Sequence, residues 1–192
     1  MKFFFLRHTS LDVKKDIFYG QTDLDVSNSF NNELKLIKKK IKTERISFSN
    51  FVVYSSPLKR CLKLAKSLHN EIHIDDRLKE MNLGDWEMKE FSSIEKNEIE
   101  KWENDLLNYK IPNGETNMDF LKRLKSFTDE IINLKKDVFI VAHAGSINGM
   151  ISNLTGEPFD KLVKNYWEKI SYGSLSLILN ENDKNTIKFL GK

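Results

Sequence analysis

The chain has 192 residues, of which 40% are hydrophobic and 31% are charged. This balance is ordinary for a globular protein and supplies enough apolar residues for a buried core, so we expect a single domain over residues 1–192. The formal net charge is only +3, from 31 basic and 28 acidic residues, which argues against a nucleic-acid or membrane partner.

The cysteine content and the apolar runs indicate where the protein works. Cys61 is the one cysteine, so no internal disulfide forms and a reducing, cytoplasmic setting fits best. The apolar run that follows Met1 is too short for a signal peptide, and no stretch is long enough to span a membrane. The sequence leaves open whether the chain forms a homodimer.

Apolar runs alternate with helical spacing along the first half of the chain. Runs at 3–6 and 51–54 predict buried strands, and 71–74 predicts a short third strand. Between the first two strands, a helix is predicted by Phe30, Leu34, Ile37 and Ile41. The sequence Ser55-Ser56-Pro57 predicts the start of another helix, with serine as the cap and proline in the first turn. Its apolar face would carry Leu58, Cys61, Leu62, Ala65 and Leu68.

The second half continues this alternation. Helices are predicted at 92–108, 120–134, 147–154 and 159–166. A buried strand at 138–142 runs directly into His143, and the chain closes with a hairpin of strands 174–179 and 186–190 around a polar turn. Strands that alternate with helices indicate an α/β fold with a mostly parallel sheet, which binds ligands beyond the carboxyl ends of its strands.

Polar residues at three of these strand ends could carry phosphate chemistry. Arg7-His8 ends the first strand, Arg60 lies in the first turns of the helix after the second, and His143 ends the fourth. An imidazole can accept a phosphoryl group, and both an arginine and a helix N-terminus favour anions. A protonated His143 with the amides of residues 144–146 would stabilise phosphate oxygens. Taken singly, each of these residues is more often structural or solvent-exposed.

Glu80 is ambiguous by its position, and other catalytic arrangements are missing. With charged neighbours at Arg77 and Lys79, Glu80 is either a solvated surface residue or a general acid that protonates a leaving oxygen. The sequence contains no phosphate loop, no G-x-G-x-x-G and no G-x-S-x-G elbow. His69 and His73 have no evident third partner, so we expect no metal site there.

Six blocks of sequence, in the same order along the chain, resemble motifs of the histidine phosphatase superfamily, which is also called phosphoglycerate-mutase-like. The blocks are LRHT at 6–9, YGQTDL at 19–24, YSSPLKRC at 54–61, LKEMNLGDWE at 78–87, PNGET at 112–116 and VAHAG at 141–145. Six blocks in this order are far more specific than any single motif.

The resemblance implies a fold, a reaction and a set of roles. The fold would be a three-layer α/β/α sandwich around a six-stranded mixed sheet. His8 would be the phosphorylated nucleophile, Glu80 the proton donor, and Arg7, Arg60 and His143 the phosphate pocket. Phosphate would pass in line to His8 and then to water, with neither a metal nor another cofactor.

The same motif positions imply contacts to the phosphate or the substrate. These positions are Tyr19, Gly20, Gln21 and Ala144. The sequence departs from the family pattern at Ala144, at Thr9 and at Lys14, where many members have glycine, glycine and asparagine. The departures at Lys14 and Ala144 bear on substrate contacts rather than on the reaction.

Within the superfamily, the sequences RHT and YGQTDL most resemble α-ribazole phosphatases, which release the 5′-phosphate of α-ribazole phosphate during cobalamin assembly. Only residues 80–115 separate the glutamate block from the PNGET block, which favours a phosphatase over a cofactor-dependent phosphoglycerate mutase. A mutase, a broad-specificity sugar-phosphate or nucleotide phosphatase, and an inactive phosphate-sensing or protein-binding module are the alternatives. The ligand would be a small phosphate ester for either enzyme and a phosphate group for the phosphate-sensing module. A protein-binding module would need neither.

Aromatic and acidic residues near these blocks have less specific roles. Tyr19, Trp86 and Phe91 could line an aromatic pocket for a base-like substrate, although Trp86 is equally suited to core packing. Glu87 and Glu115 are expected to form hydrogen bonds or to cap helices near the site, without a part in the chemistry.

Overall fold

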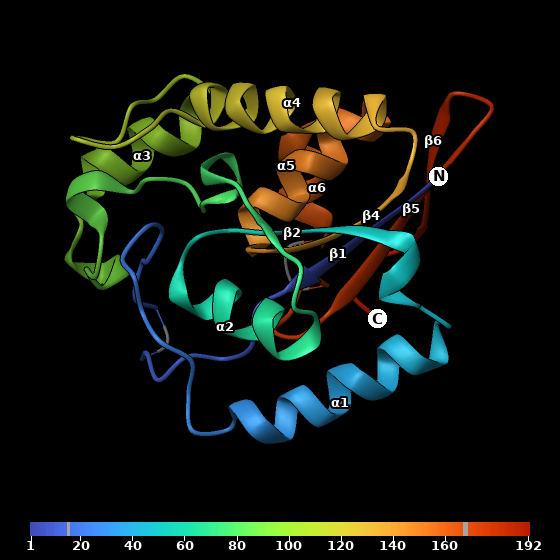
Figure 1. The fold of residues 1–192 in the computed structure, drawn as a ribbon. Helices are drawn as coiled ribbons and strands as arrows, with labels where there is room; N and C mark the ends of the chain where they lie inside the picture. Colours follow the sequence, from blue (N-terminus) through green and yellow to red (C-terminus); the bar gives the residue numbers. More distant parts are fainter. Residues whose placement is uncertain (15, 167–168) are drawn as a thin grey trace.

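A computed structural model describes residues 1–14, 16–166 and 169–192 of the chain. Its centre is a mixed sheet of six strands in the order β3-β2-β4-β1-β5-β6 (Figure 1). The strands are β1 (Lys2–Arg7), β2 (Phe51–Ser55), β3 (His73–Ile74), β4 (Asp137–Ala142), β5 (Leu175–Glu181) and β6 (Lys184–Phe189). The predicted α/β fold with a six-stranded mixed sheet is confirmed.

The central strand β1 explains how the sheet combines two pairing directions. It pairs in parallel with β4 and antiparallel with β5, while β2 runs parallel to both β3 and β4. Residues Phe3 to Leu6 are at most 3% exposed, because helices cover both faces of this strand. A continuous apolar run is the pattern expected of a strand that is buried on both sides.

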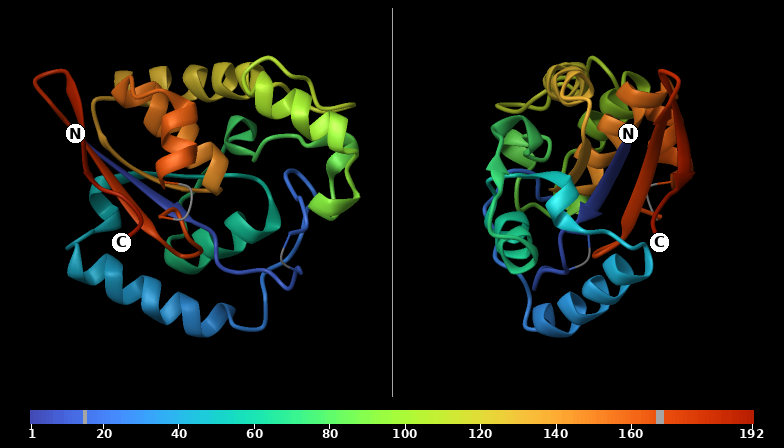
Figure 2. Two further views of the ribbon diagram at one scale, coloured as in Figure 1. Left: turned by 180° about the vertical axis from the view of Figure 1, so that it is seen from behind. Right: turned by 45° about the vertical axis from the view of Figure 1, so that its right-hand side comes forward.

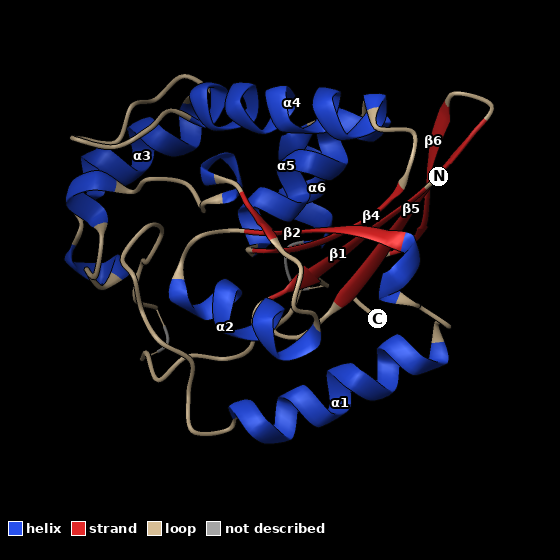
Figure 3. Cartoon of the chain, in the orientation of Figure 1, coloured by secondary structure: helices blue, strands red, loops and turns tan. Residues whose placement is uncertain are grey.

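Helices form the two outer layers (Figures 2 and 3). Helices α1 (Phe30–Thr43) and α2 (Lys59–Leu68) cover one face, and α4 (Asn117–Asn133), α5 (Ala144–Thr155) and α6 (Phe159–Tyr166) cover the other. Alternate residues of β1 point to opposite faces of the sheet and pack in different core clusters. Phe3 and Phe5 pack with α4 and α5, whereas Phe4 and Leu6 pack with α1 and α2, as the two-residue period of a strand requires.

The start of α2 differs from the prediction. The helix begins at Lys59, after Leu58 as its N-cap residue, and no side chain caps it. The Ser56 hydroxyl, expected to act near this cap, lies 2.8 Å from Nε2 of His143. On the buried face of α2, Leu64 takes the place that we expected for Leu62. Arg60 also lies on this buried face.

The other differences are at element boundaries. The helix expected over 92–108 is the shorter α3 (Lys96–Asn104), preceded by a 3-10 turn at Phe91–Ser93. The Ser93 hydroxyl donates to the carbonyl of Glu90 at 2.7 Å, and such local bonds compete with helix formation. In the final hairpin both strands extend into the expected turn, because Asn182 and Asp183 adopt positive φ angles of 50° and 59° and close it tightly.

Candidate active site

His8 lies at the carboxyl end of β1, where it is 1% exposed. Its Nδ1 is 2.8 Å from the carbonyl oxygen of Thr9. A carbonyl can only accept, so Nδ1 carries the proton and Nε2 keeps its lone pair. Burial, followed by the charges of Arg7 and Arg60, holds the pKa of His8 well below its ordinary value of 6.5. The ring is therefore neutral near pH 7, and Nε2 is available as a nucleophile.

His143 ends β4 and precedes α5, with its ring centroid 5.2 Å from that of His8. Arg60 donates its Nε–H to Nδ1 of His143 at 3.1 Å, so Nε2 carries the hydrogen and points to Ser56. Burial, then the charge of Arg60, lowers the pKa of His143 well below 6.5. The expectation of a protonated ring was therefore wrong for this arrangement. A neutral His143 is instead fixed in one tautomer by a charged donor.

Arg60 is fully buried, which sets it apart from an arginine on a solvated helix face. Its Nη1 donates to the carbonyl of Thr22 at 2.8 Å, and its Nη2 donates to that of Gly20 at 2.6 Å. With the bond to His143, these contacts use three of the five N–H groups of the guanidinium. None of the three partners carries a negative charge. A buried cation held by neutral groups is costly, and an anionic ligand would offset that cost.

Arg7 supplies a second cation beside His8. Its Nη1 donates to the carbonyl of Ile170 at 2.7 Å, and its Cζ lies 4.1 Å from the centre of the Tyr172 ring. Its Nε is buried without a hydrogen-bond partner among the described residues. Tyr172 also forms a hydroxyl contact with Tyr19, and this contact joins the loop after β1 to the segment before β5. The two arginines thus give the space around His8 a positive potential.

Glu80 lies against the first turn of α5. Its Oε2 accepts from the amide of Gly145 at 2.8 Å, and its Oε1 accepts from the amide of Met81 at 3.0 Å. The approach requires glycine, because a Cβ on Gly145 would lie 2.4 Å from Oε1. The Gly145 amide, which we expected to bind phosphate, is therefore already bound to Glu80.

The loop that follows β1 supports the site through its backbone. The amides of Gly20, Gln21 and Thr22 donate to the carboxylate of Glu87 at 2.9, 2.7 and 3.2 Å. The side chain of Gln21 donates to the carbonyl of Glu80 at 3.0 Å. Gly20 and Gln21, which we expected to contact the substrate, do not line the cavity; they hold Arg60 and Glu80 in place.

A cavity of about 570 Å³ opens from the two histidines. Arg7, Arg60 and Glu80 provide the charged groups among its described lining residues, together with Tyr19 and Ala144 at the same end. The rest of the wall is mostly apolar and includes Ile17, Phe18, Leu83, Phe91, Trp102, Leu106, Phe120, Phe159 and Val163. The opening therefore combines a cationic end with an apolar body.

One of the three aromatic residues proposed for this wall lies elsewhere. Tyr19 and Phe91 line the cavity, but Trp86 is 3% exposed and packs in the core. Its ring stacks on Tyr109 at 5.9 Å and meets Trp102 edge-on at 6.0 Å. Trp102 contributes to the cavity wall in its place.

Three residues near the site were not predicted to act there: Ser56, Tyr172 and Arg123. The sequence around Ser56 predicts a helix cap, and nothing in the sequence around Tyr172 distinguishes it. Arg123 could have been suspected, because it is one of five arginines in a chain whose basic residues are mostly lysine. Its guanidinium donates to the backbone carbonyl of Glu80 at 2.8 Å.

His69 and His73, for which we expected no metal site, contact different aromatic rings. The ring of His69 stacks on Phe48, whereas that of His73 lies against Tyr54. Within residues 1–14, 16–166 and 169–192, no three His, Cys, Asp or Glu side chains are grouped as a metal site would require. In those same ranges no helix has the length and apolar character needed to cross a membrane.

The family model of the histidine phosphatase superfamily (branch 1) matches residues 3–192, so the chain belongs to that superfamily. The chain is 24% identical over 200 residues to a protein of Hydrogenobacter thermophilus provisionally named phosphoserine phosphatase 2, covering 100% of this chain and 95% of that protein.

Two solved structures share the fold across the chain. The α-ribazole phosphatase of Shigella flexneri superposes with a TM-score of 0.84 at 22% identity, covering 100% of this chain and 96% of that one. A phosphoserine phosphatase of Entamoeba histolytica superposes with a TM-score of 0.82 at 17% identity, with the same coverage. These likenesses establish the fold, and the two names describe different substrates.

Proposed function

We propose that the protein is a cytoplasmic, metal-independent phosphomonoester hydrolase that works through a phosphohistidine on His8. The observation that carries this proposal is the state of His8, which is buried, neutral and free at Nε2 beside the buried cation of Arg60. A neutral imidazole can attack phosphorus, and a cation with neutral partners can hold the phosphoryl oxygens.

The reaction would proceed in two in-line transfers. Nε2 of His8 attacks phosphorus and the ester P–O bond breaks, while Glu80 gives its proton to the departing oxygen. Arg7 and Arg60 hold the phosphoryl oxygens as charge moves onto them. His143 lies beside them and is fixed in its tautomer by Arg60, with its Nε2–H toward Ser56. Water then attacks the phosphohistidine, Glu80 takes a proton from that water, and the P–N bond breaks to restore His8. The positive charge needed for both transfers comes from the two arginines.

The shape of the cavity supports α-ribazole 5′-phosphate as the substrate. Its base is flat and apolar, and the cavity of about 570 Å³ presents Phe18, Phe91 and Trp102 beyond the cationic end. Pockets for molecules of this size span roughly 300–1,000 Å³ and are mostly apolar. The structural likeness to α-ribazole phosphatase supports the same choice.

Phosphoserine is the second candidate, favoured by the names of relatives in sequence and in structure. Its carboxylate would need a cationic partner besides those that hold the phosphate. Among the described lining residues the cations are Arg7 and Arg60, and both are adjacent to His8. The lining therefore supports the apolar substrate better. A phosphoglycerate mutase meets the same difficulty, because its substrate also carries a carboxylate.

The test is phosphate release in the presence of EDTA from α-ribazole 5′-phosphate, phosphoserine, 3-phosphoglycerate and p-nitrophenyl phosphate. We expect EDTA-resistant release, the highest kcat/KM for the ribazole ester, and loss of release in His8→Ala. Equal values for all esters would reject the ribazole assignment and keep the mechanism. Release from no ester would favour an inactive binding module, and phosphate transfer that requires a bisphosphoglycerate primer would favour a mutase.

A further inference from the structure

Arg123 contacts the segment that carries Glu80 from the neighbouring helix α4. Its Nη1 donates to the carbonyl oxygens of Arg77 at 2.7 Å and Lys79 at 2.8 Å, and its Nη2 donates to that of Glu80 at 2.8 Å. Carbonyls of three residues within one short segment therefore converge on a single guanidinium. A lysine could not satisfy them in this geometry, because its ammonium lacks the planar fork of donors.

Glu115 holds the same guanidinium from its other edge. Its Oε1 accepts from Nε of Arg123 at 2.7 Å, and its Oε2 accepts from Nη2 at 2.9 Å. The carboxylate also accepts from the amide of Asn82 at 2.8 Å, and the Glu115 amide donates to the carbonyl of Asn82 at 2.9 Å. The backbone on both sides of Glu80 is thus attached to the Arg123–Glu115 pair. The two side chains are each 20% exposed, so the pair is shielded from most solvent.

The segment that carries Glu80 has little regular structure of its own. A 3-10 helix ends at Leu78 and another begins at Gly84, so residues 79–83 lie between helices. At the far end of the side chain, Glu80 contacts Gly145 of α5 at 2.8 Å. Proton transfer to a leaving oxygen tolerates little displacement, since errors near 1 Å cost roughly 10²-fold in rate.

We propose that Arg123 is the positioning residue for proton transfer by Glu80, acting through the backbone of residues 77–82. This inference rests on the proposed phosphatase function. It assigns to α4 a role in the chemistry, although Arg123 itself does not line the cavity.

The dependence on the leaving group separates this role from a structural one. An alkyl phosphate needs a proton on its departing oxygen, whereas p-nitrophenolate leaves without one. A misplaced Glu80 therefore slows hydrolysis of the alkyl ester far more than hydrolysis of the activated aryl ester. General damage to the fold lowers both rates by the same factor, because it lowers the amount of active protein.

The experiment measures kcat/KM for phenethyl phosphate and p-nitrophenyl phosphate in the parent, Glu80→Gln, Arg123→Lys and Arg123→Gln. In both Arg123 variants we expect kcat/KM to fall by about 10- to 100-fold for the alkyl ester and by less than about threefold for the aryl ester. Glu80→Gln should show the same selectivity, with a larger fall for the alkyl ester. Adding Arg123→Lys to Glu80→Gln should cost little more, because both changes affect one step.

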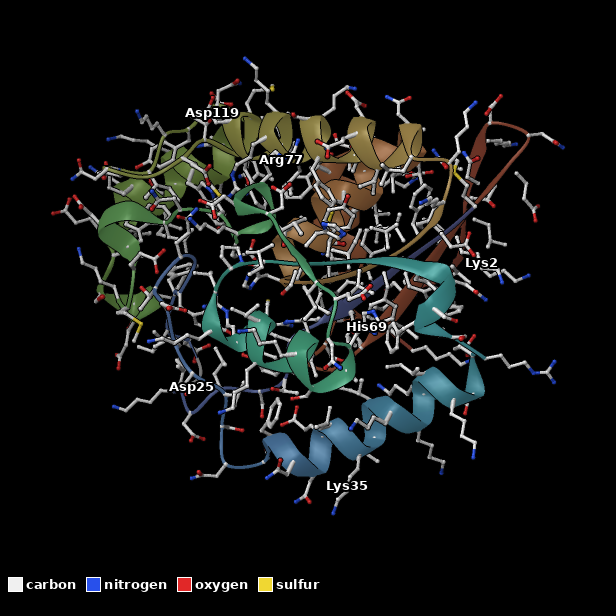
Figure 4. The ribbon with its side chains drawn as sticks, viewed as in Figure 1. Lys2, Asp25, Lys35, His69, Arg77 and Asp119 are labelled. Atoms are coloured by element: carbon white, nitrogen blue, oxygen red, sulfur yellow. The ribbon has the colours of Figure 1, made fainter. Side chains whose placement is uncertain are left out.

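Lys125→Gln is the matched control, because it removes a cation from the same helix. Lys125 lies on α4, whose side chains are drawn in Figure 4, and its ammonium pairs with Asp129 at 2.7 Å. Its side chain is 61% exposed and lies outside the segment that carries Glu80, so this variant should keep the ratio of the two rates. If Arg123→Gln fails to fold, Glu115→Gln weakens the same pair and takes its place.

Two outcomes overturn the inference. Equal losses on both esters would show that Arg123 has only a structural role, and an unchanged ratio in a folded Arg123→Lys would show the same. The parent protein and His8→Ala are measured in parallel. If the parent releases no phosphate, or His8→Ala retains the release, the proposed function fails, and this result is distinct from a failure of the positioning role alone.

Discussion

The Nε–H of Arg60 lies 3.1 Å from Nδ1 of His143 and donates to it, so a buried cation fixes the tautomer of a buried neutral imidazole. This contact decides which nitrogen of His143 carries hydrogen and faces Ser56. It also ties the helix after β2 to the end of β4. Arg60 and His143 together therefore set both the positive charge and the direction of the hydrogen bonds in the proposed phosphate site.

Replacing Arg60 by lysine should remove this control. Lysine cannot donate to His143, Gly20 and Thr22 together, so we expect kcat/KM to fall by about 10²- to 10³-fold. Steady-state phosphate release measures the loss. Arg45→Lys, at an exposed position, is the control and should retain parental activity. Parental activity in Arg60→Lys would contradict the assigned role.

The two buried histidines should make stability depend on pH. Both have a folded pKa below 6.5, so the unfolded chain binds protons first on acidification. The free energy of unfolding is therefore fully retained above about pH 6.5 and falls below it, by up to about 1.4 kcal/mol per pH unit for each ring.

Urea denaturation at pH 7.5 and 5.5 would test this prediction. His143→Gln should lose less stability between these pH values than the parent, because one of the two rings is gone. The exposed His73→Gln serves as the control. The same loss in His143→Gln as in the parent would exclude His143 as a source of the effect.

A methyl group on Gly145 should displace the Glu80 carboxylate. Because that Cβ would lie 2.4 Å from Oε1, we expect Gly145→Ala to lower kcat/KM for alkyl phosphates by about 10²-fold. Gly149→Ala is the matched control in the same helix, where a Cβ would meet Cδ1 of Leu124 at 2.5 Å. It should lower the thermal midpoint without changing the preference between alkyl and aryl esters. A similar preference change in both variants would count against the Glu80 contact.

The apolar wall should contribute to binding of the substrate base. Phe91 is 44% exposed, lines the cavity and packs against Phe18 at 5.6 Å between ring centres. We expect Phe91→Ala to raise KM for α-ribazole 5′-phosphate about tenfold, a factor consistent with the loss of part of one buried aromatic side chain. The KM for glycerol phosphate should change little. Leu36→Ala removes an exposed apolar residue on α1 and is the control.

The sequence predicted the layers better than the boundaries. The run Phe3 to Leu6 and the spacing of Phe30 and Ile37 depend on burial, which leaves a period in the sequence. The start of α2 was misplaced because Ser56 bonds to His143, 87 residues away, and no local pattern reports such a partner. Local sequence patterns predict which secondary structure a segment favours, and tertiary contacts then decide where that helix or strand begins and ends.

The residues of the site could be predicted from the sequence, but their protonation states and supporting contacts could not. The motifs identified His8, Arg60, Glu80 and His143, and the structure brings all four to one cavity, although their roles remain predictions. The protonation of His143 depends on burial and on the donor beside it, and the sequence specifies neither. The support from Arg123 was missed because it acts on carbonyl oxygens, which every residue possesses.

The position of β1 in the sheet has a consequence for synthesis of the protein. This first strand lies between β4 and β5, and Arg7 donates to the carbonyl of Ile170. A growing chain therefore carries Phe3 to Leu6 without either neighbouring strand until most of the sequence has been translated. Such long-range pairing folds slowly and leaves an apolar strand open to aggregation meanwhile. The proposed phosphate site should be among the last parts of the protein to form, and incomplete chains should lack its buried charges altogether.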